Sequence, residues 1–248
     1  MKMTIPSLSG VVLAIALAGC GSDSPTWRDV LQQVDLTQSV FSLAYAADPP
    51  DGTFLTVATQ VGRDPASACS AYETQQLPTD FWYLGIDTTS TAVGSYAVVD
   101  RISPPSALAL ATVKLVHVRD GAKVETVAAI RGDVNVQAAP QNAQEWNDNG
   151  DLQGTISVEI PIEPWREYMC TGAQQTGQSD PIVTSCDCLG PNGQTAQCAP
   201  ETPTQNCCAQ IGAAAGTTPF SAPVAATRCP WMCKFTDPAL ARECLALQ

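Results

Sequence analysis

Cysteine is the residue type whose number and spacing could support the most chemistry in this chain. The 248 residues include 11 cysteines, and a thiol can be acylated, oxidised to a disulfide or deprotonated to bind a metal. Cys20 stands apart near the start of the chain, directly after Leu17-Ala18-Gly19. The ten that follow are an even number, which in an exported protein favours five disulfide bonds. The compartment in which the protein folds therefore decides between these chemistries.

The first 19 residues have the three parts of a secretory signal peptide. Lys2 gives a positive charge, residues 11–17 form an unbroken apolar run, and Ala18 and Gly19 stand before Cys20. The apolar run is much shorter than the ~20 residues that cross a bilayer as a helix. We therefore expect residues 1–19 to be removed on export. An ordinary signal peptide with an incidental cysteine is the alternative.

The sequence Leu17-Ala18-Gly19-Cys20 resembles the lipobox of bacterial lipoproteins, in which the cysteine thiol receives a diacylglyceryl group before cleavage. The resemblance implies acyl chains such as palmitate on Cys20, residues 20–26 as a tether, and a membrane as partner through this lipid. Two or three chains anchor stably because each buried CH₂ contributes about 0.8 kcal/mol. An Asp directly after the lipidated cysteine would resemble the retention signal of inner-membrane lipoproteins. This chain has Gly21 at that position, so we expect it in the outer membrane of the cell envelope.

The other ten cysteines fall into two groups. Cys69 and Cys170 bracket most of the β-rich part of the chain, and we expect them to pair with each other, closing a loop of ~100 residues that would stabilise the domain by about 4–5 kcal/mol. The remaining eight are expected to pair among themselves: Cys186, Cys188, Cys198, Cys207, Cys208, Cys229, Cys233 and Cys244. Adjacent Cys207 and Cys208 should have different partners, since their Cα atoms are ~3.8 Å apart. Their connectivity is otherwise left open.

A metal site in the same region is the alternative to disulfides. Cys186-Asp187-Cys188 and Cys229-Pro230-Trp231-Met232-Cys233 form pairs, and zinc accepts four thiolates. Zinc sites favour Cys-x₂₋₄-Cys pairs in a reducing compartment, and one of these pairs has a spacer of a single residue. We therefore expect disulfides, with no metal and no cofactor.

Catalytic motifs are few in this sequence. His117 is the single histidine, and a lone histidine on a strand is more often a packing residue than a general base. No Gly-x-Ser-x-Gly elbow, His-Glu-x-x-His helix or P-loop occurs, although acid–base chemistry by two carboxylates stays open. Asn147-Asp148-Asn149-Gly150-Asp151 resembles part of a calcium loop, but Asn-Gly before a strand favours a turn. We expect a protein that is not an enzyme.

The elements that position these residues are expected to be β-strands. Residues 27–171 alternate apolar and polar side chains with period two, broken by turn residues. Residues 155–162 give the clearest single strand. Asp120-Gly121, a pair that favours a type I′ turn, joins residues 107–119 and 123–131 into the clearest hairpin. The pattern predicts an antiparallel β-sandwich or barrel.

The end of the chain has a different composition. Residues 172–180 hold no apolar side chain larger than alanine and read as a flexible linker. Residues 181–248 have few large aliphatic side chains, so we expect a separate, mostly irregular module held by its cysteines. Asp237-Pro238 resembles the start of a helix, which predicts a short one at the C-terminal end.

The overall charge excludes some partners. The chain carries 24 acidic and 12 basic residues, a formal net charge of −12. Nucleic acid is disfavoured because its phosphates require Lys and Arg, and a broad basic patch on anionic lipid is disfavoured for the same reason.

Four stretches resemble the β-domain lipoproteins that gliding, predatory soil bacteria carry in many copies: Phe81-Trp82-Tyr83-Leu84, Gly94-Ser95-Tyr96-Ala97-Val98-Val99-Asp100, Leu115-Val116-His117-Val118-Arg119-Asp120-Gly121 and Leu152-Gln153-Gly154-Thr155-Ile156-Ser157-Val158. These are strand and turn patterns, so the resemblance implies a β fold and no catalytic residue. We expect a lipid-anchored exported protein with a structural or binding role toward a protein or glycan that the sequence does not identify. The alternatives are a secreted enzyme or enzyme inhibitor that acts through residues 181–248, and a metal-binding tail.

Overall fold

The computed structural model describes residues 25–46, 52–102, 108–140, 145, 150–173, 182–202, 204–230, 232 and 243–244. The predicted signal peptide, Cys20, the calcium-like residues 147–149, Cys233 and the predicted helix start at Asp237-Pro238 lie outside these residues.

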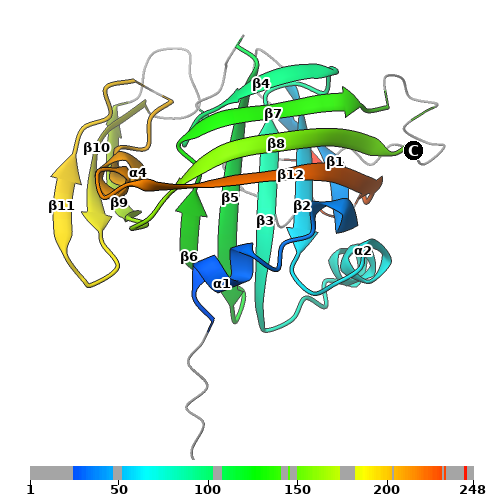
Figure 1. Ribbon diagram of the computed structural model, residues 1–248, viewed down its shortest axis with the longest axis horizontal. Coiled ribbons are helices and arrows are strands. Elements are labelled where there is room, and N and C mark those ends of the chain that lie inside the picture. Colours follow the sequence, from blue (N-terminus) through cyan, green and yellow to red (C-terminus); the bar gives the residue numbers. More distant parts are fainter. Residues whose placement is uncertain are drawn as a thin grey trace, which may run out of the picture.

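Eight strands close into a barrel (Figure 1). They are β1 (Ser39–Ala46), β2 (Gly52–Gln60), β3 (Asp80–Thr88), β4 (Gly94–Val98), β5 (Leu110–Arg119), β7 (Arg131–Ala138), β8 (Leu152–Pro161) and β12 (Thr217–Arg228). The order is β12-β8-β7-β4-β5-β3-β2-β1, and parallel pairing of β1 with β12 closes the ring. The mainly β fold that the sequence predicts is confirmed, as a barrel.

Period-two alternation places one side-chain set inside this barrel. Along β8 the residues are alternately buried and exposed, as the sequence predicts, with Ile156, Val158 and Ile160 each 2% exposed. The interior cluster draws side chains from every strand of the ring, and it includes Phe41 and Tyr96. A barrel of eight strands is just wide enough for side chains to fill. The interior is therefore a packed core.

A short helix, α1 (Trp27–Leu31), covers one end of the barrel, and the 3-10 helix η1 (Leu36–Gln38) follows it (Figure 1). Trp27, Val30 and Leu31 belong to the interior cluster. The Thr26 hydroxyl accepts a hydrogen bond from the Asp29 backbone, and the Asp29 carboxylate accepts one from the Thr26 N–H, a capping box that fixes where the helix begins.

Among the described strands β6 (Ala122–Ala128) pairs with β5 alone, and the two form the predicted hairpin. Asp120 and Gly121 have φ angles of 51° and 77°, the left-handed values that a type I′ turn requires. The turn prediction is confirmed.

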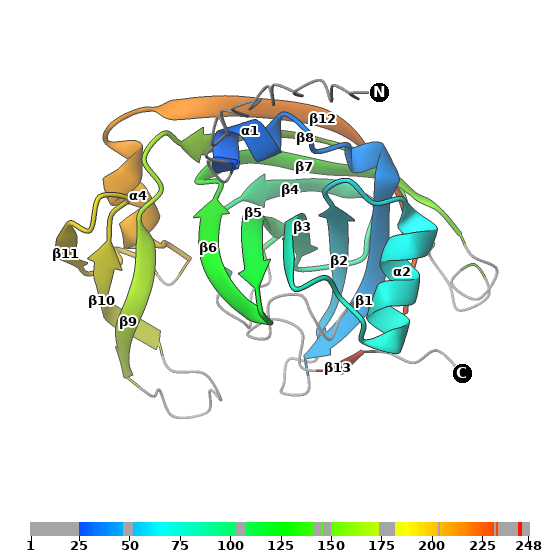
Figure 2. The same cartoon turned by 90° about the horizontal axis from the view of Figure 1, so that it is seen from below.

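The longest of the described helices, α2 (Pro65–Thr74), packs on the outer face of the barrel (Figure 2). Its Ala68 and Tyr72 cluster with Val40, Tyr83 and Val116 from the strands. A disulfide joins Cys69 on this helix to Cys229 just after β12. The predicted Cys69–Cys170 bond is therefore wrong, because β12 returns beside β1 and brings Cys229 to the helix.

The second, smaller sheet has the order β11-β10-β9. It comprises β9 (Arg166–Ala173), β10 (Ile182–Leu189) and β11 (Thr195–Cys198), and α4 (Cys207–Ala213) packs against it. We call the described residues between β8 and β12 the insertion. Three disulfides staple it: Cys170–Cys186, Cys188–Cys208 and Cys198–Cys207.

The predicted division of the chain needs correction. Residues 181–248 are not a separate module, because they contain β12, which closes the barrel, and residues 172–173 belong to β9 rather than a linker. The eight late cysteines do not pair only among themselves, since Cys186 bonds Cys170 and Cys229 bonds Cys69. Cys207 and Cys208 do have different partners, as predicted. Within the predicted C-terminal helix, Glu243–Cys244 form a strand, β13, paired with β1.

Candidate ligand groove

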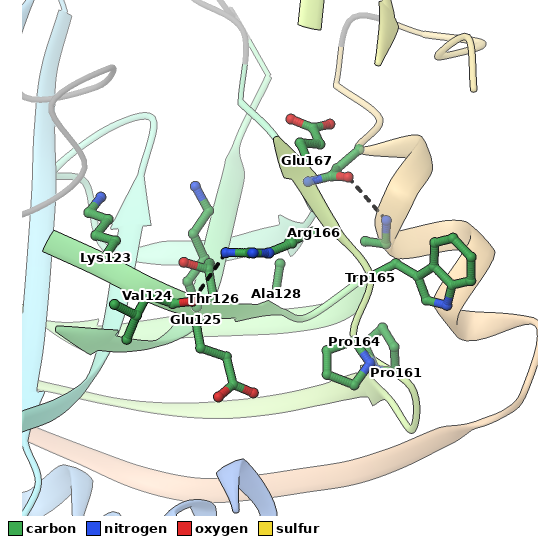
Figure 3. A pocket seen from close by; sticks show the side chains of 13 residues that line it. Lys123, Val124, Glu125, Thr126, Ala128, Pro161, Pro164, Trp165, Arg166 and Glu167 are labelled. Atoms are coloured by element: carbon green, nitrogen blue, oxygen red, sulfur yellow. Dashed lines mark hydrogen bonds between the residues drawn. The ribbon is translucent and has the colours of Figure 1, made fainter. Parts of the chain in front are cut away.

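A groove of about 300 Å³ lies between the barrel and the insertion (Figure 3). The strands β5 and β6 form one wall, and the start of β9 with α4 forms the other. The lining residues that matter below are Lys114, Lys123, Glu125, Thr126, Arg166 and Glu167.

Both walls of the groove end in an unpaired strand edge. Within the described residues β6 pairs only with β5, and β9 pairs only with β10. Figure 2 shows these two strands facing each other across the space between barrel and insertion. Backbone N–H and C=O groups on such edges are available to a further hydrogen-bonded chain.

A β-bulge at Val124 places two charged side chains of β6 on different faces of the strand. Glu125 is opposite His117 in the β5–β6 register, whereas Lys123 is opposite Val118, so Val124 is the extra residue. A bulge re-aims the side chains that flank it. Lys123 consequently lies on the outer face with Thr126, and Glu125 turns the other way, as Figure 3 shows.

Three basic side chains line the groove: Lys114, Lys123 and Arg166. Lys114 and Lys123 also line an adjoining depression of about 90 Å³ on the outer face of β3, β5 and β6. Neither Lys123 nor Arg166 has a carboxylate within ion-pair distance among the described residues. Arg166 instead reaches across the groove and donates from Nη1 to the Val124 carbonyl oxygen at 3.3 Å (Figure 3).

The two carboxylates of the groove do not cancel this charge fully. Burial raises the pKa of Glu125, opposed by the charges of His117 and Arg166. Glu167 is ion-paired through Oε2 with Arg101, whose guanidinium is also part-buried. The groove is therefore lined by more basic than acidic side chains, although the chain has a net charge of −12.

Buried contacts hold the insertion in this position. Asp100, 3% exposed, accepts hydrogen bonds from the Asn206 backbone N–H and from Gln210 Nε2. Burial raises the pKa of Asp100, and these hydrogen bonds oppose the rise. Gly212 lies so close to the Glu163 carbonyl that an added Cβ would overlap it. The groove therefore exists because these contacts hold the insertion against the barrel.

His117 lies beside the groove but faces the end of the barrel. Its Nε2 is 2.6 Å from Asp80 Oδ1, and its ring stacks on Trp82, its cross-strand neighbour, with centroids 4.4 Å apart. Hydrogen bonds from His117 and Arg119 lower the pKa of Asp80. The cross-strand packing that the sequence predicts for His117 is confirmed by this stacking.

An open pocket of about 600 Å³ lies over His117, between α1 and the β5–β6 hairpin. Trp27, Arg28, Trp82, Arg119 and Glu125 line it together with the histidine. Arg28 is held over the Trp27 ring and donates to the Ile162 carbonyl oxygen. These contacts brace the end of the barrel.

The cysteine sites are structural where they are described. The sulfur atoms of Cys188, Cys198 and Cys208 lie close enough together to hold a metal, as do Glu167 Oε, Cys170 Sγ and Cys186 Sγ. Every cysteine in both groups is already bonded to another cysteine. Only the backbone of Cys244 is described.

Sequence reasoning missed the groove. Lys114 and Lys123 flank the Asp120-Gly121 turn in an acidic chain, which is a signal that could have been found. Arg166 reaches them only because β9 turns back toward β6, and no local pattern reports that.

No helix among the described residues is long and apolar enough to cross a membrane. No family model, curated protein or solved structure matches this chain.

Proposed function

We propose that this chain is an exported lipoprotein, anchored through lipid on Cys20, whose barrel and insertion together bind an anionic ligand in the groove between them. The role is binding rather than catalysis. The observation that carries the proposal is the grouping of Lys114, Lys123 and Arg166 around one groove in a strongly acidic protein.

Local charge decides whether an anion can bind here. Two opposite unit charges 4 Å apart attract by about 4 kcal/mol at the effective dielectric of a protein surface. Repulsion from the rest of the acidic surface is screened over ~8 Å at physiological ionic strength. Three cations and two carboxylates line the groove, and one of these carboxylates, Glu167, is paired with Arg101, so a ligand inside the groove meets more positive than negative charge.

The packed barrel supports the same choice of site. Side chains from all strands fill its interior, so the barrel acts as a scaffold for surface sites.

The described chain begins at Pro25, five residues after Cys20, and leads directly into α1. A tether this short would hold the barrel within ~18 Å of the lipid anchor.

Two measurements test the two parts of the proposal. The intact mass of membrane-purified protein is expected to correspond to a chain that begins at an acylated Cys20. An unacylated mass would contradict the anchor.

Binding is tested by fluorescence anisotropy with fluorescein-labelled oligo-glutamate at physiological salt. We expect the wild type to bind and Lys123→Glu to bind at least tenfold more weakly. Arg63→Glu, the same charge reversal beside α2, is the matched control and should bind as the wild type does. Equal binding by all three proteins would contradict the groove as the site.

A further inference from the structure

We infer that the groove binds an extended acidic peptide segment of a partner protein, which adds as a strand to the free edge of β6. This inference rests on the proposed function and specifies its ligand.

The first argument is the free edge itself. In an antiparallel pair, alternate residues turn both backbone N–H and C=O groups toward the outside edge. Strand β6 has β5 on one side and the groove on the other. The Val124 carbonyl already accepts a hydrogen bond from Arg166, so the backbone of β6 faces the groove at this point.

The second argument is the part of the edge that stays open. Bulges and lysines blunt the edges of natural sheets. Here the bulge lies at Val124, near the turn end of β6, and the Arg166 side chain covers the same point. Thr126 and Ala128 line the groove farther along the strand. An added strand would therefore pair with the second half of β6.

The third argument is the charge pattern. Side chains on one face of an extended chain recur every second residue, ~6.8 Å apart. Lys123 comes from β6 on one wall, and Arg166 comes from β9 on the other. A peptide with carboxylates at alternate positions can reach cations on both walls.

The fourth argument separates a peptide from other anions. The outer edge of β6 offers backbone carbonyl groups as well as N–H groups, and no other strand pairs with it among the described residues. A peptide brings backbone N–H and C=O groups at the spacing of this edge together with its carboxylates, whereas an inorganic polyphosphate brings no such alternating donors and acceptors.

Three labelled peptides test the inference on the unmodified full-length protein. They are capped (Glu-Thr)₄, the same peptide with an N-methyl group on every backbone nitrogen, and capped (Lys-Thr)₄. The methylated peptide keeps every charge but loses the donors that strand addition requires. We expect (Glu-Thr)₄ to bind, N-methylation to weaken binding at least tenfold, and (Lys-Thr)₄ not to bind.

The outcomes distinguish this inference from the proposed function. Equal binding of methylated and unmethylated (Glu-Thr)₄ would overturn strand addition while leaving an anion-binding groove. Failure of both (Glu-Thr)₄ and oligo-glutamate to bind would overturn both. A concentration-dependent dimer that (Glu-Thr)₄ disperses would make a second copy the occupant and would also overturn the inference.

Discussion

Lys123 and Glu125 lie on opposite faces of β6 although only one residue separates them. Residues two apart on a regular strand share a face, and the bulge at Val124 breaks that rule here. Lys123 thereby lies on the outer face with Lys114, whereas Glu125, which also lines the groove, turns toward His117 at the end of the barrel. A single extra residue thus places the two charged side chains on different faces of β6.

The disulfide between Cys69 and Cys229 should contribute most to stability. It spans 160 residues, whereas Cys170–Cys186 spans 16. The chain-entropy model gives about 5 kcal/mol for a loop of the first size and about 3 kcal/mol for the second. The double variant Cys69→Ser with Cys229→Ser should therefore lose more free energy of unfolding in urea than Cys170→Ser with Cys186→Ser. An equal or smaller loss would contradict the assignment, as would a Cys69–Cys170 fragment in a non-reducing peptide map.

Replacing Asp100 should loosen the insertion without unfolding the barrel. Asp100→Ala leaves the Asn206 N–H and Gln210 without their acceptor, at a cost of about 1–3 kcal/mol for each unsatisfied buried group. Hydrogen exchange should accelerate in residues 204–213 and stay slow in β8. Asp100→Asn should recover part of the protection because its carbonyl oxygen still accepts one bond. Asp151→Ala, an exposed site, is the control.

Stability should fall in acid through Asp80. Hydrogen bonds from His117 and Arg119 hold the pKa of this carboxyl below its ordinary value of ~3.9. A carboxyl with a lower pKa in the folded than in the unfolded chain stabilises the fold above the unfolded pKa. That contribution is lost as the pH falls through the folded pKa. The stability difference between wild type and Asp80→Asn in urea should therefore be present at pH 7 and shrink below about pH 4.

The control for this pH series is Asp151→Asn, because Asp151 is exposed and makes no hydrogen bond within the described chain. A difference for Asp80→Asn that stays constant from pH 7 to pH 3 would show that its cause is not ionisation.

Alanine substitutions at two glycines should distinguish the cost of backbone strain from the cost of steric overlap. Both Gly121 and Gly132 have positive φ, 77° and 128°. An added Cβ meets nothing within 4 Å at Gly121 but overlaps the Ser157 carbonyl at Gly132. Gly121→Ala should cost about 1–2 kcal/mol from the backbone alone. Gly132→Ala should cost about 1–3 kcal/mol more from overpacking between β7 and β8, measured by urea unfolding. Equal costs would contradict the close approach of these strands.

Local patterns predicted much of the barrel. The alternation along β8 and the Asp120-Gly121 turn depend on neighbouring residues, and both are as expected. The strand β12 was missed because Pro219 and Pro223 argue against a central strand. It tolerates both prolines because its second edge pairs with β1 only at Ala226–Arg228.

The disulfide partner of Cys69 and the groove could not be predicted from the sequence for a related reason. Both depend on where β12 and β9 return in space, and such long-range pairing leaves no mark on the spacing of nearby residues. Cys229 sits 160 residues from its partner. Arg166 is likewise remote from Val124 in sequence, yet its side chain contacts the Val124 carbonyl.

Hydrogen exchange with and without saturating oligo-glutamate tests the central claim most directly, because it locates the ligand on the intact protein. The account predicts slower exchange in residues 122–128 and 166–173, with no change in α2. Protection that is absent from both strands, or that appears at α2 instead, would contradict a ligand site between the barrel and the insertion.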